Sequence, residues 1–386
     1  MNARLHFCLA LLLASAALAE EKHPWPATTE KALAAAGANR LELERALTNA
    51  PAEQREGIHF LIDNMPQTDL ASLKAEFLLT HVAQSYQAME HAPWASLVPK
   101  EIFLNDVLPY ASLNEVRDDG RQKLREIAAP LVKDCKTPGE AAQALNQKLF
   151  GIVKVKYSTT RRKPDQSSLE SMQSGVATCS GLSILLVDAC RAVGVPARVA
   201  GTPLWTNLRG NHTWVEIWDG DWHFAGAAEP DGSGLDHGWF AGDAAAADNS
   251  KAEHRIYASS FKRTGISFPL VWDLSIDWVP AVNVTERYTG AAKSPEGKVR
   301  LLVRVLDKPE GRRVAARVTV TDAADASVSF TGTSSSETAD LNNILPFQLV
   351  PGHTYHLEIR AHEKSVEKEI AVTKESEQIL TIPLTP

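Results

Sequence analysis

Several motifs that would point to a metal or a nucleotide are missing from this sequence. It has four cysteines but no Cys-x-x-Cys pair, no His-Glu-x-x-His segment and no acidic loop with calcium-ligand spacing, so we expect no structural or catalytic metal. Gly-x-Gly-x-x-Gly and phosphate-loop motifs are absent, which argues against a bound nucleotide. Gly-x-Ser-x-Gly is also absent, which argues against a serine hydrolase. No cofactor is therefore expected.

A block of basic residues is missing as well. Lys and Arg total 40 against 47 Asp and Glu, which gives a formal net charge of −7. Nucleic-acid binding requires clustered cations, so nucleic acid is not an expected partner. Hydrophobic residues make up 44% and charged residues 23%, as in ordinary globular proteins, and 386 residues are enough for two or three domains.

The N-terminus has the pattern of a cleavable signal peptide. Arg4 precedes an apolar run over residues 7–16, and Ala17-Leu18-Ala19 places small residues before a cleavage point. The run is too short to cross a bilayer as a helix, and no later stretch is apolar enough to do so. We therefore expect residues 1–19 to be removed and the mature protein to be exported, either to a periplasm or outside the cell.

Hydrophobic periodicity divides the remaining chain into three predicted domains. Residues 20–130 are expected to be helical, because apolar residues recur at helical spacing from Ile58 to Met65 and again from Leu70 to Val82, where Thr68 or Asp69 would cap the second helix. Residues 131–290 mix helices and strands. After a linker at 291–297, residues 297–386 alternate as short strands, which predicts a C-terminal β-sandwich.

The middle region contains segments with clear boundaries. Thr137-Pro138-Gly139-Glu140 fits a capping box and starts a helix, and a second helix begins near Cys179 and stops at Gly194. Residues 212–218 alternate as a strand, and residues 222–225 form the returning strand of a hairpin. Between these strands, Asp219-Gly220-Asp221 predicts a turn with its carboxylates in solvent.

Cys179 and His212 are the candidate reactive pair. A thiol attacks acyl carbon as the thiolate, and its ordinary pKa of about 8.5 must be lowered for this. A helix N-terminus at Cys179 supplies positive potential and free backbone N–H groups, one of which could stabilise an oxyanion. His212, opening the adjacent strand, could take the thiol proton, and a third group from the neighbouring strand would orient its imidazole.

Two segments carry a resemblance to a known family. They are GVATCSGLSILLVDACRAVGVPARVAG (175–201) and GNHTWVEIWDGDWHFAGAAEPDG (210–232). The first resembles the nucleophile helix of the transglutaminase-like superfamily, circularly permuted relatives of papain, and the second resembles its His-x-Trp-x-Glu strand and return strand. The resemblance covers about 131–290 and implies an α+β fold in which this core follows an N-terminal helical region and precedes a C-terminal β-sandwich. It also implies Cys179 as nucleophile and His212 as base.

The third member of the site departs from the family pattern. The family places an Asp, often followed by Pro, a few residues after the return-strand Trp, and that position is Gly226 here. Glu229, followed by Pro230, is the nearest carboxylate downstream and is the predicted third group. Asp231 is the reserve candidate. A position without a carboxylate would imply slow catalysis or its loss.

Other residues near the motifs are candidates for the cleft. Gln173 and Gln166 are candidates to stabilise an oxyanion or line the cleft, as is Trp205, although ordinary loop contacts explain each of them as well. The mature chain would keep an odd number of cysteines, so a disulfide between Cys135 and Cys190 would leave Cys179 as the free thiol.

Two functions follow from these observations. The first is a thiol-dependent acyl-transfer enzyme that acts on amide bonds of a protein or peptide through a thioester, released by water or by an amine, with hydrolysis slightly favoured. The second is a catalytically inactive binding or surface-assembly protein that keeps the fold, motivated by the displaced acidic residue. The reactivity of the thiol at position 179 separates the two. The oligomeric state is left open by the sequence.

Overall fold

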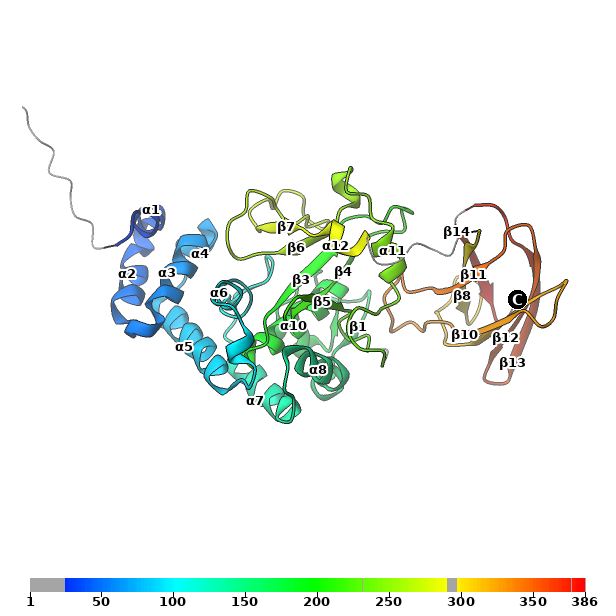
Figure 1. Cartoon of the computed structure of the whole chain (residues 1–386), viewed down its shortest axis with the longest axis horizontal. Helices are drawn as coiled ribbons and strands as arrows, with labels where there is room; N and C mark the ends of the chain where they lie inside the picture. Colours follow the sequence, from blue (N-terminus) through cyan, green and yellow to red (C-terminus); the bar gives the residue numbers. More distant parts are fainter. Residues whose placement is uncertain (1–24, 231, 290–296, 376, 386) are drawn as a thin grey trace, which may run out of the picture.

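A computed structural model describes residues 25–230, 232–289, 297–375 and 377–385. The N-terminal helices, a central mixed α/β core and a C-terminal group of strands follow one another along the long axis of the molecule (Figure 1). The expected signal peptide and most of the expected linker lie outside the described residues. Within the described part of the chain, no helix is long and apolar enough to cross a membrane.

The N-terminal region is helical, as its periodicity predicts. Its helices are α1 (Ala27–Ala35), α2 (Arg40–Asn49), α3 (Arg55–Asn64), α4 (Gln67–Leu70), α5 (Ala75–His91) and α6 (Lys100–Asp106), with 3-10 turns η1 (Gly37–Asn39), η2 (Ala52–Gln54) and η3 (Ala95–Leu97). Ile58, Leu61 and Ile62 are fully buried and belong to one apolar cluster that joins these helices. The apolar face of each amphipathic helix is therefore what holds this region together.

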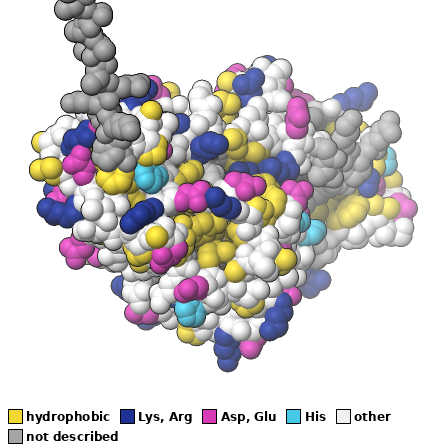
Figure 2. All heavy atoms as spheres, turned by 60° about the vertical axis from the view of Figure 1, so that its left-hand side comes forward, with side chains coloured by type: hydrophobic (Ala, Val, Ile, Leu, Met, Phe, Trp, Pro, Cys, Tyr) yellow, Lys and Arg dark blue, Asp and Glu magenta, His cyan; other side chains and the backbone are white. Residues whose placement is uncertain are grey.

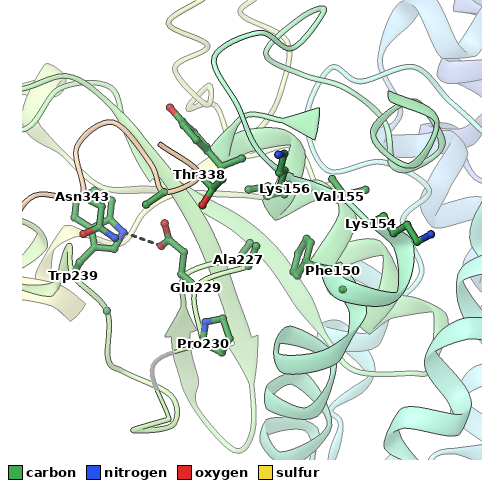
Figure 3. A pocket seen from close by; sticks show the side chains of 16 residues that line it. Phe150, Lys154, Val155, Lys156, Ala227, Glu229, Pro230, Trp239, Thr338 and Asn343 are labelled. Atoms are coloured by element: carbon green, nitrogen blue, oxygen red, sulfur yellow. Dashed lines mark hydrogen bonds between the residues drawn. The ribbon is translucent and has the colours of Figure 1, made fainter. Parts of the chain in front are cut away.

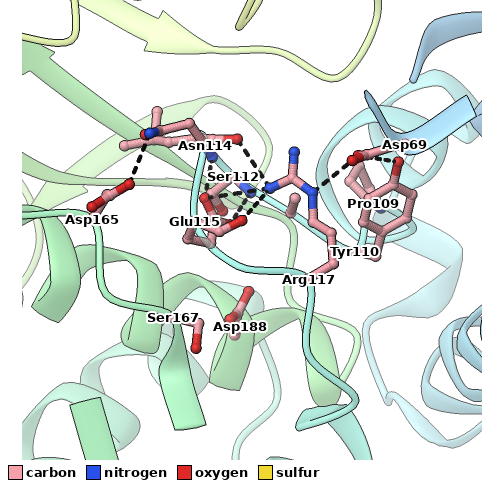
Figure 4. A network of polar contacts seen from close by, with 12 residues as sticks. Asp69, Pro109, Tyr110, Ser112, Asn114, Glu115, Arg117, Asp165, Ser167 and Asp188 are labelled. Carbon is pink, nitrogen blue, oxygen red and sulfur yellow. Dashed lines mark hydrogen bonds and ion pairs between the residues drawn. The ribbon is translucent and has the colours of Figure 1, made fainter. Parts of the chain in front are cut away.

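The predicted cap of the second helix is wrong. The chain between Leu70 and Ala75 is not helical, so α4 and α5 are separate helices. Asp69 does not cap either one; its carboxylate accepts hydrogen bonds from Tyr110 Oη (2.8 Å) and Arg117 Nε (2.9 Å) (Figure 4). A buried carboxylate requires such partners, and here they come from a segment distant in sequence.

Residues 107–120 connect the N-terminal helices to the core through polar contacts. Glu115 accepts hydrogen bonds from the backbone N–H groups of Ser112 and Leu113, and Asn114 donates to Asp165 (2.8 Å) (Figure 4). Arg117 lies between Asp69 and Glu115 and is mostly buried. The segment is therefore fixed on both sides by charged hydrogen bonds.

The core places helices beside a five-stranded sheet. Its helices are α7 (Arg121–Val132), α8 (Pro138–Val153), α9 (Ser168–Ser174), α10 (Cys179–Ala192), α11 (Ala241–Ala245) and α12 (Thr285–Thr289), with η4 (Ala252–His254). The sheet order is β5-β4-β3-β6-β7, every neighbour antiparallel, with β3 (Ala197–Thr202), β4 (His212–Trp218), β5 (Trp222–Ala225), β6 (Tyr257–Ser259) and β7 (Ala281–Asn283). β1 (Lys156–Tyr157) and β2 (Val176–Ala177) pair separately in parallel. The predicted hairpin at 212–225 is confirmed.

The hairpin turn corrects one prediction. Thr137 caps α8 as expected, accepting a hydrogen bond from Glu140 N (3.2 Å). Asp219, however, does not point to solvent: its Oδ2 accepts hydrogen bonds from Thr137 Oγ1 (2.9 Å) and Gly139 N (3.2 Å). A carboxylate at a helix N-terminus satisfies free N–H groups and opposes the positive end of the helix dipole. The turn therefore ties the β4–β5 hairpin to α8.

Two arginines of the R-A-x-G-x-P-A-R segment serve the packing. Arg191, at the end of α10, is buried and donates to the backbone oxygens of Asp106 (3.1 Å), Ala197 (3.0 Å) and Ala111 (3.0 Å). Arg198 pairs with the fully buried Glu216 of β4 at 2.7 Å. These guanidinium groups join α10, the sheet and the N-terminal region at one place.

The C-terminal strands form two sheets. One has the order β10-β9-β12-β13 and the other β11-β8-β14, built from β8 (Val299–Leu306), β9 (Arg317–Asp322), β10 (Ser329–Thr333), β11 (Leu345–Leu349), β12 (Thr354–Ala361), β13 (Lys364–Ala371) and β14 (Glu377–Pro383). Leu301, Val318 and Leu357, from both sheets, are buried in one apolar cluster. We call residues 297–385 the C-terminal β-module.

The surface has mixed charge on the face shown in Figure 2. Basic and acidic side chains are interspersed there, and apolar side chains gather in the centre of the view. This distribution agrees with a mildly acidic chain without a cationic block.

Replacing Arg191 with alanine is expected to destabilise the protein by about 3 kcal/mol, because several buried carbonyl groups lose their donor. Arg312→Ala is the matched control, since the Arg312 side chain is 77% exposed, and it should change stability by less than about 0.5 kcal/mol. Urea unfolding followed by tryptophan fluorescence measures both. Equal stability of the two variants would contradict the structural role of Arg191.

Candidate active site

Cys179 is the first residue of α10, as the sequence predicts. Thr178 precedes it as the N-cap, accepting a hydrogen bond from Gly181 N (3.0 Å) and donating one to Pro164 O (2.5 Å). The Cys179 side chain is half-buried and lines a pocket of about 310 Å³. The thiol therefore stands at the positive end of a helix dipole, next to open space.

His212 is the first residue of β4 and lies among aromatic rings. Its side chain is 2% exposed, and its ring centroid lies 4.6 Å from that of Trp239, 4.9 Å from Phe240 and 5.8 Å from Trp214. Neither ring nitrogen has a hydrogen-bond partner among the described residues. A buried imidazole with both nitrogens unsatisfied is costly, which marks it as a group held for a purpose other than packing.

The hydroxyl groups next to the candidate pair link the helix to the strand. Ser180 Oγ and Thr213 Oγ1 lie 2.9 Å apart in a buried hydrogen bond. Each hydroxyl belongs to the residue directly after a member of the pair, so this bond fixes the start of α10 against the start of β4. Cys179 and His212 are thereby brought together.

A third group completes the cluster, and it is not the predicted one. Asp340, on the segment between β10 and β11, contributes a carboxylate whose Oδ2 lies 3.7 Å from His212 Nδ1. One atom each of Cys179, His212 and Asp340 lie within 4.8 Å of one another. Sequence reasoning missed Asp340, because it belongs to the C-terminal β-module and no local motif signals which loop will face the core.

The electrostatics couple these groups. Burial alone would lower the pKa of His212, but the side chains of Asp340 and Cys179 outweigh it and raise the pKa to about 10. Burial would raise the pKa of Asp340, yet the neighbouring imidazole brings it below its usual value. Geometry and charge therefore both favour an imidazolium at His212 paired with the Asp340 carboxylate.

Glu229, the predicted third member, lies on another side of this cluster. Its Oε2 accepts a hydrogen bond from Trp239 Nε1 (2.8 Å) (Figure 3). The centroid of the Trp239 ring lies 4.6 Å from that of His212. Burial raises the pKa of Glu229 to about 7, and the charge of His212 acts in the opposite direction. Glu229 thus reaches the imidazole through Trp239. Asp231, the reserve candidate, lies outside the described residues.

The other predicted cleft residues lie in different places. Gln166 is buried near the start of α10, where its Nε2 donates to Ser174 Oγ and Val176 O and its Oε1 has no partner in the described structure. Trp205 is buried and its ring centroid lies 6.2 Å from that of His212, so it forms part of the aromatic surround. Gln173, on α9, is exposed and lines neither pocket beside the cluster.

A larger pocket lies beside Glu229. It has a volume of about 840 Å³ and is walled by Phe150, Ala227, Trp239 and, from the C-terminal β-module, Thr338 and Asn343 (Figure 3). The smaller pocket at Cys179 is walled on the same module by residues 340–342. The segment 338–343 therefore lines both hollows, and the smaller one is also lined by Cys179 and Asp340 of the cluster.

Buried ion pairs dock the C-terminal β-module on the core. Asp243 of α11 pairs with Arg209 of the core and with Arg300 of β8, the latter at 2.6 Å, and Glu377 of β14 pairs with Arg209 at 3.0 Å. Arg209 also donates to Asn342 O (2.9 Å). Because these charges are largely buried, each depends on the others for its partner.

The three described cysteines are free thiols. Cys135 is partly exposed, and Cys190 is fully buried in α10. The hypothesis of a Cys135–Cys190 disulfide is therefore wrong. Thiol, imidazole and carboxylate are also ligand types of Zn²⁺, and among the described residues the Cys179, His212 and Asp340 group alone brings three of them together.

Geometry and motif together define a cysteine–histidine site at a helix N-terminus of a mixed α/β core. Residues 125–244 match the model of the transglutaminase-like superfamily, so this part of the chain is a transglutaminase-like domain. The predicted resemblance is thereby confirmed. No curated protein matches the chain.

Three solved structures are similar to this chain at low identity. A candidate cysteine protease from Cytophaga hutchinsonii is 20% identical, with a TM-score of 0.27, over 33% of this chain and 44% of that one. Red sea bream transglutaminase is 11% identical, with a TM-score of 0.31, over 73% and 66%. A candidate protease from Parabacteroides distasonis is 9% identical, with a TM-score of 0.27, over 62% and 36%. This chain covers less than two thirds of the length of each of these three proteins.

The protonation state of His212 can be measured directly. In protein with isotope-labelled histidine, the His212 ring should keep the NMR signature of an imidazolium at pH 8. Asp340→Asn should lower its pKa, because the carboxylate that opposes the effect of burial is then removed.

The same pair affects stability. The contribution of the raised pKa of His212 is complete at pH 6.5, the usual histidine pKa, and is lost as the pH rises towards 10. The lowered pKa of Asp340 contributes above the ordinary aspartate pKa and is lost in acid. Glu337→Gln is the control, since Glu337 is exposed on the same loop. A wild-type His212 that titrates near pH 6.5 would contradict the ion pair.

Proposed function

We propose that this protein is a thiol-dependent acyl-transfer enzyme acting on amide bonds of peptides or proteins. The observation that carries the proposal is the meeting of Cys179, at the N-terminus of α10, with His212, at the start of β4, beside an open pocket. The match of residues 125–244 to the transglutaminase-like superfamily supports the same chemistry.

The reaction would proceed in two halves. The Cys179 thiolate attacks the amide carbon, the carbon–nitrogen bond breaks, and the imidazolium of His212 gives its proton to the leaving amine. The thioester is then attacked by water, which loses one proton to His212; the carbon–sulfur bond breaks, and a carboxylic acid and the Cys179 thiolate are released. An amine that replaces this water would form a new amide instead. The free N–H groups at the start of α10 would stabilise the oxyanion in both halves.

Hydrolysis is the favoured outcome. The thiol is half-buried and lines a pocket that is open to solvent, so water reaches the thioester. Transamidation requires that water be excluded while an amine is bound.

Export remains part of the proposal, and its support is the signal pattern of residues 1–19. We also propose a permuted papain-like core and a C-terminal β-sandwich, since the two sheets of the C-terminal β-module share one apolar cluster.

A second candidate function is a binding or surface-assembly protein without catalysis. The ion pair between His212 and Asp340 favours it, because an imidazole that is already neutralised by a carboxylate is a weaker partner for the thiol. Substrate conversion separates the two candidates.

The test uses a peptide library with and without a biotinylated primary amine, and mass spectrometry reads cleavage, side-chain deamidation or amine addition. Wild type should give products, and Cys179→Ala should reduce them by at least about 10³-fold. Cys135→Ala is the matched control, because Cys135 is also a free and partly exposed thiol, and it should keep full activity. Product from Cys179→Ala would exclude the thiol mechanism; no product from wild type would favour the binding protein.

Glu229 is proposed to position the imidazole through Trp239. Glu229→Gln keeps an acceptor for Trp239 Nε1 but removes the charge that can stabilise the imidazolium, so kcat should fall by about 10-fold or more. The thermal unfolding midpoint should change little. Asp325→Asn, at an exposed turn of the C-terminal β-module, is the control. Full activity of Glu229→Gln would remove Glu229 from the machinery.

A further inference from the structure

Asp340 cannot act as the orienting acid of a relay in which the imidazole lies between thiol and carboxylate. That arrangement separates sulfur and carboxylate by two hydrogen bonds of roughly 3 Å each plus the width of the ring. Here the sulfur and a carboxylate oxygen lie within 4.8 Å of each other. Thiol and carboxylate are therefore on the same side of His212, and Asp340 faces the space in which a substrate reacts.

The segment that carries Asp340 is held firmly. Arg313 donates to the backbone oxygens of Ala339, Asp340 (2.9 Å) and Asn343 (3.1 Å). On the core side, Asn342 Nδ2 donates to Asn211 O (3.0 Å), and Tyr157 Oη accepts from Leu341 N (3.4 Å). Hydrogen bonds from the core and from the C-terminal β-module fix the conformation of residues 338–343. The Asp340 carboxylate is therefore held in position as part of the wall of the site.

One of the two carboxylate oxygens of Asp340 is available for a further hydrogen bond. Asp340 Oδ1 accepts a hydrogen bond from Asn342 N (2.8 Å). Oδ2 has His212 as its partner at 3.7 Å, which is an ion pair longer than a hydrogen bond, and it accepts no hydrogen bond within the described part of the chain. The nearby guanidinium of Arg313 is engaged with backbone oxygens. A buried anion in this state is suited to a small cation that brings its own N–H donors.

We propose that Asp340 binds a substrate ammonium group next to the reacting carbonyl, and that the loop 338–343 makes the site exo-acting. The inference rests on the proposed function and names its substrate class: peptides or amides with a free primary amine on the residue whose carbonyl forms the thioester. An acceptor amine in transamidation has the same chemistry and could use the same carboxylate.

The distances fit an α-amino group. In an amino acid the nitrogen lies about 2.5 Å from the carbonyl carbon, and an attacking atom approaches that carbon to about 3 to 3.5 Å. A carboxylate oxygen within 4.8 Å of the sulfur is therefore in reach of that ammonium group. A residue that preceded the reacting one would be attached to this same nitrogen and would extend towards Asp340, where residues 340–342 of the loop wall the pocket at Cys179.

Binding of the ammonium group would also prepare the reaction. When the substrate cation pairs with Asp340, the carboxylate no longer requires the charge of His212. The charge of the imidazolium then favours the thiolate form of Cys179, and the proton of the thiol passes to solvent water. Recognition and activation would thus use the same carboxylate.

Alkylation of Cys179 tests this inference without requiring turnover. The probes are an alanine chloromethyl ketone with a free amino group and its N-acetyl derivative, with rates read from peptide mass on the full chain. In wild type the free-amine probe should react at least about 10-fold faster, as a buried ion pair allows. Asp340→Asn should abolish that preference, and Glu337→Gln should keep it.

Each other result has a definite meaning. Equal rates for the two probes in wild type would overturn the inference while leaving the thiol mechanism intact. Faster reaction of Asp340→Asn with both probes would also overturn it and would make the loop an inhibitory plug. A Cys179 that reacts with neither probe nor iodoacetamide would defeat the proposed function itself.

A competition experiment separates the two amine sources. An unlabelled primary amine is added to a free-amine peptide substrate. Competition without incorporation identifies the substrate's own amino group as the ligand of Asp340, and incorporation identifies an acceptor amine.

Discussion

The buried hydrogen bond between Ser180 and Thr213 is the contact on which the candidate site depends. It joins the first turn of α10 to the first residues of β4, and each partner is the neighbour of a reactive residue. Neither element could shift along the other without breaking a buried polar contact, whose loss leaves both hydroxyl groups unsatisfied. The distance between thiol and imidazole is in this way a property of the backbone as well as of two side chains.

The surrounding motif divides its residues between chemistry and support. Cys179 lines the pocket and His212 lies buried beside it, whereas Arg191 and Arg198 are buried with backbone oxygens and with Glu216 as partners. Tyr288 and Arg287 also contact Glu216, so the sheet and α12 share one buried carboxylate. A family motif can therefore be specific because some of its residues carry the chemistry and the others hold those residues in position.

The local parts of this structure follow from the sequence, and the long-range parts do not. The start of α10, the cap of α8 and the hairpin at 212–225 depend on neighbouring residues, so capping and alternation predict them. The sequence predicts local roles for Asp69 and Asp219, but their partners come from distant segments. Asp340 follows the same rule: its loop has no chemical motif, and docking of the C-terminal β-module alone places it beside Cys179. Tertiary contacts decided each of these cases.

The contribution of the C-terminal β-module to the site has a consequence for the order of assembly. Chains are synthesised from the N-terminus, and N-terminal domains fold first. Helix α10 and strand β4 are made long before residue 340, so the thiol and the imidazole can meet before the carboxylate arrives. The site is finished at the last stage of folding, when Arg300 and Glu377 of the C-terminal β-module close their ion pairs with Asp243 and Arg209. A newly made chain would thus acquire its full chemistry only after its final strands are in place.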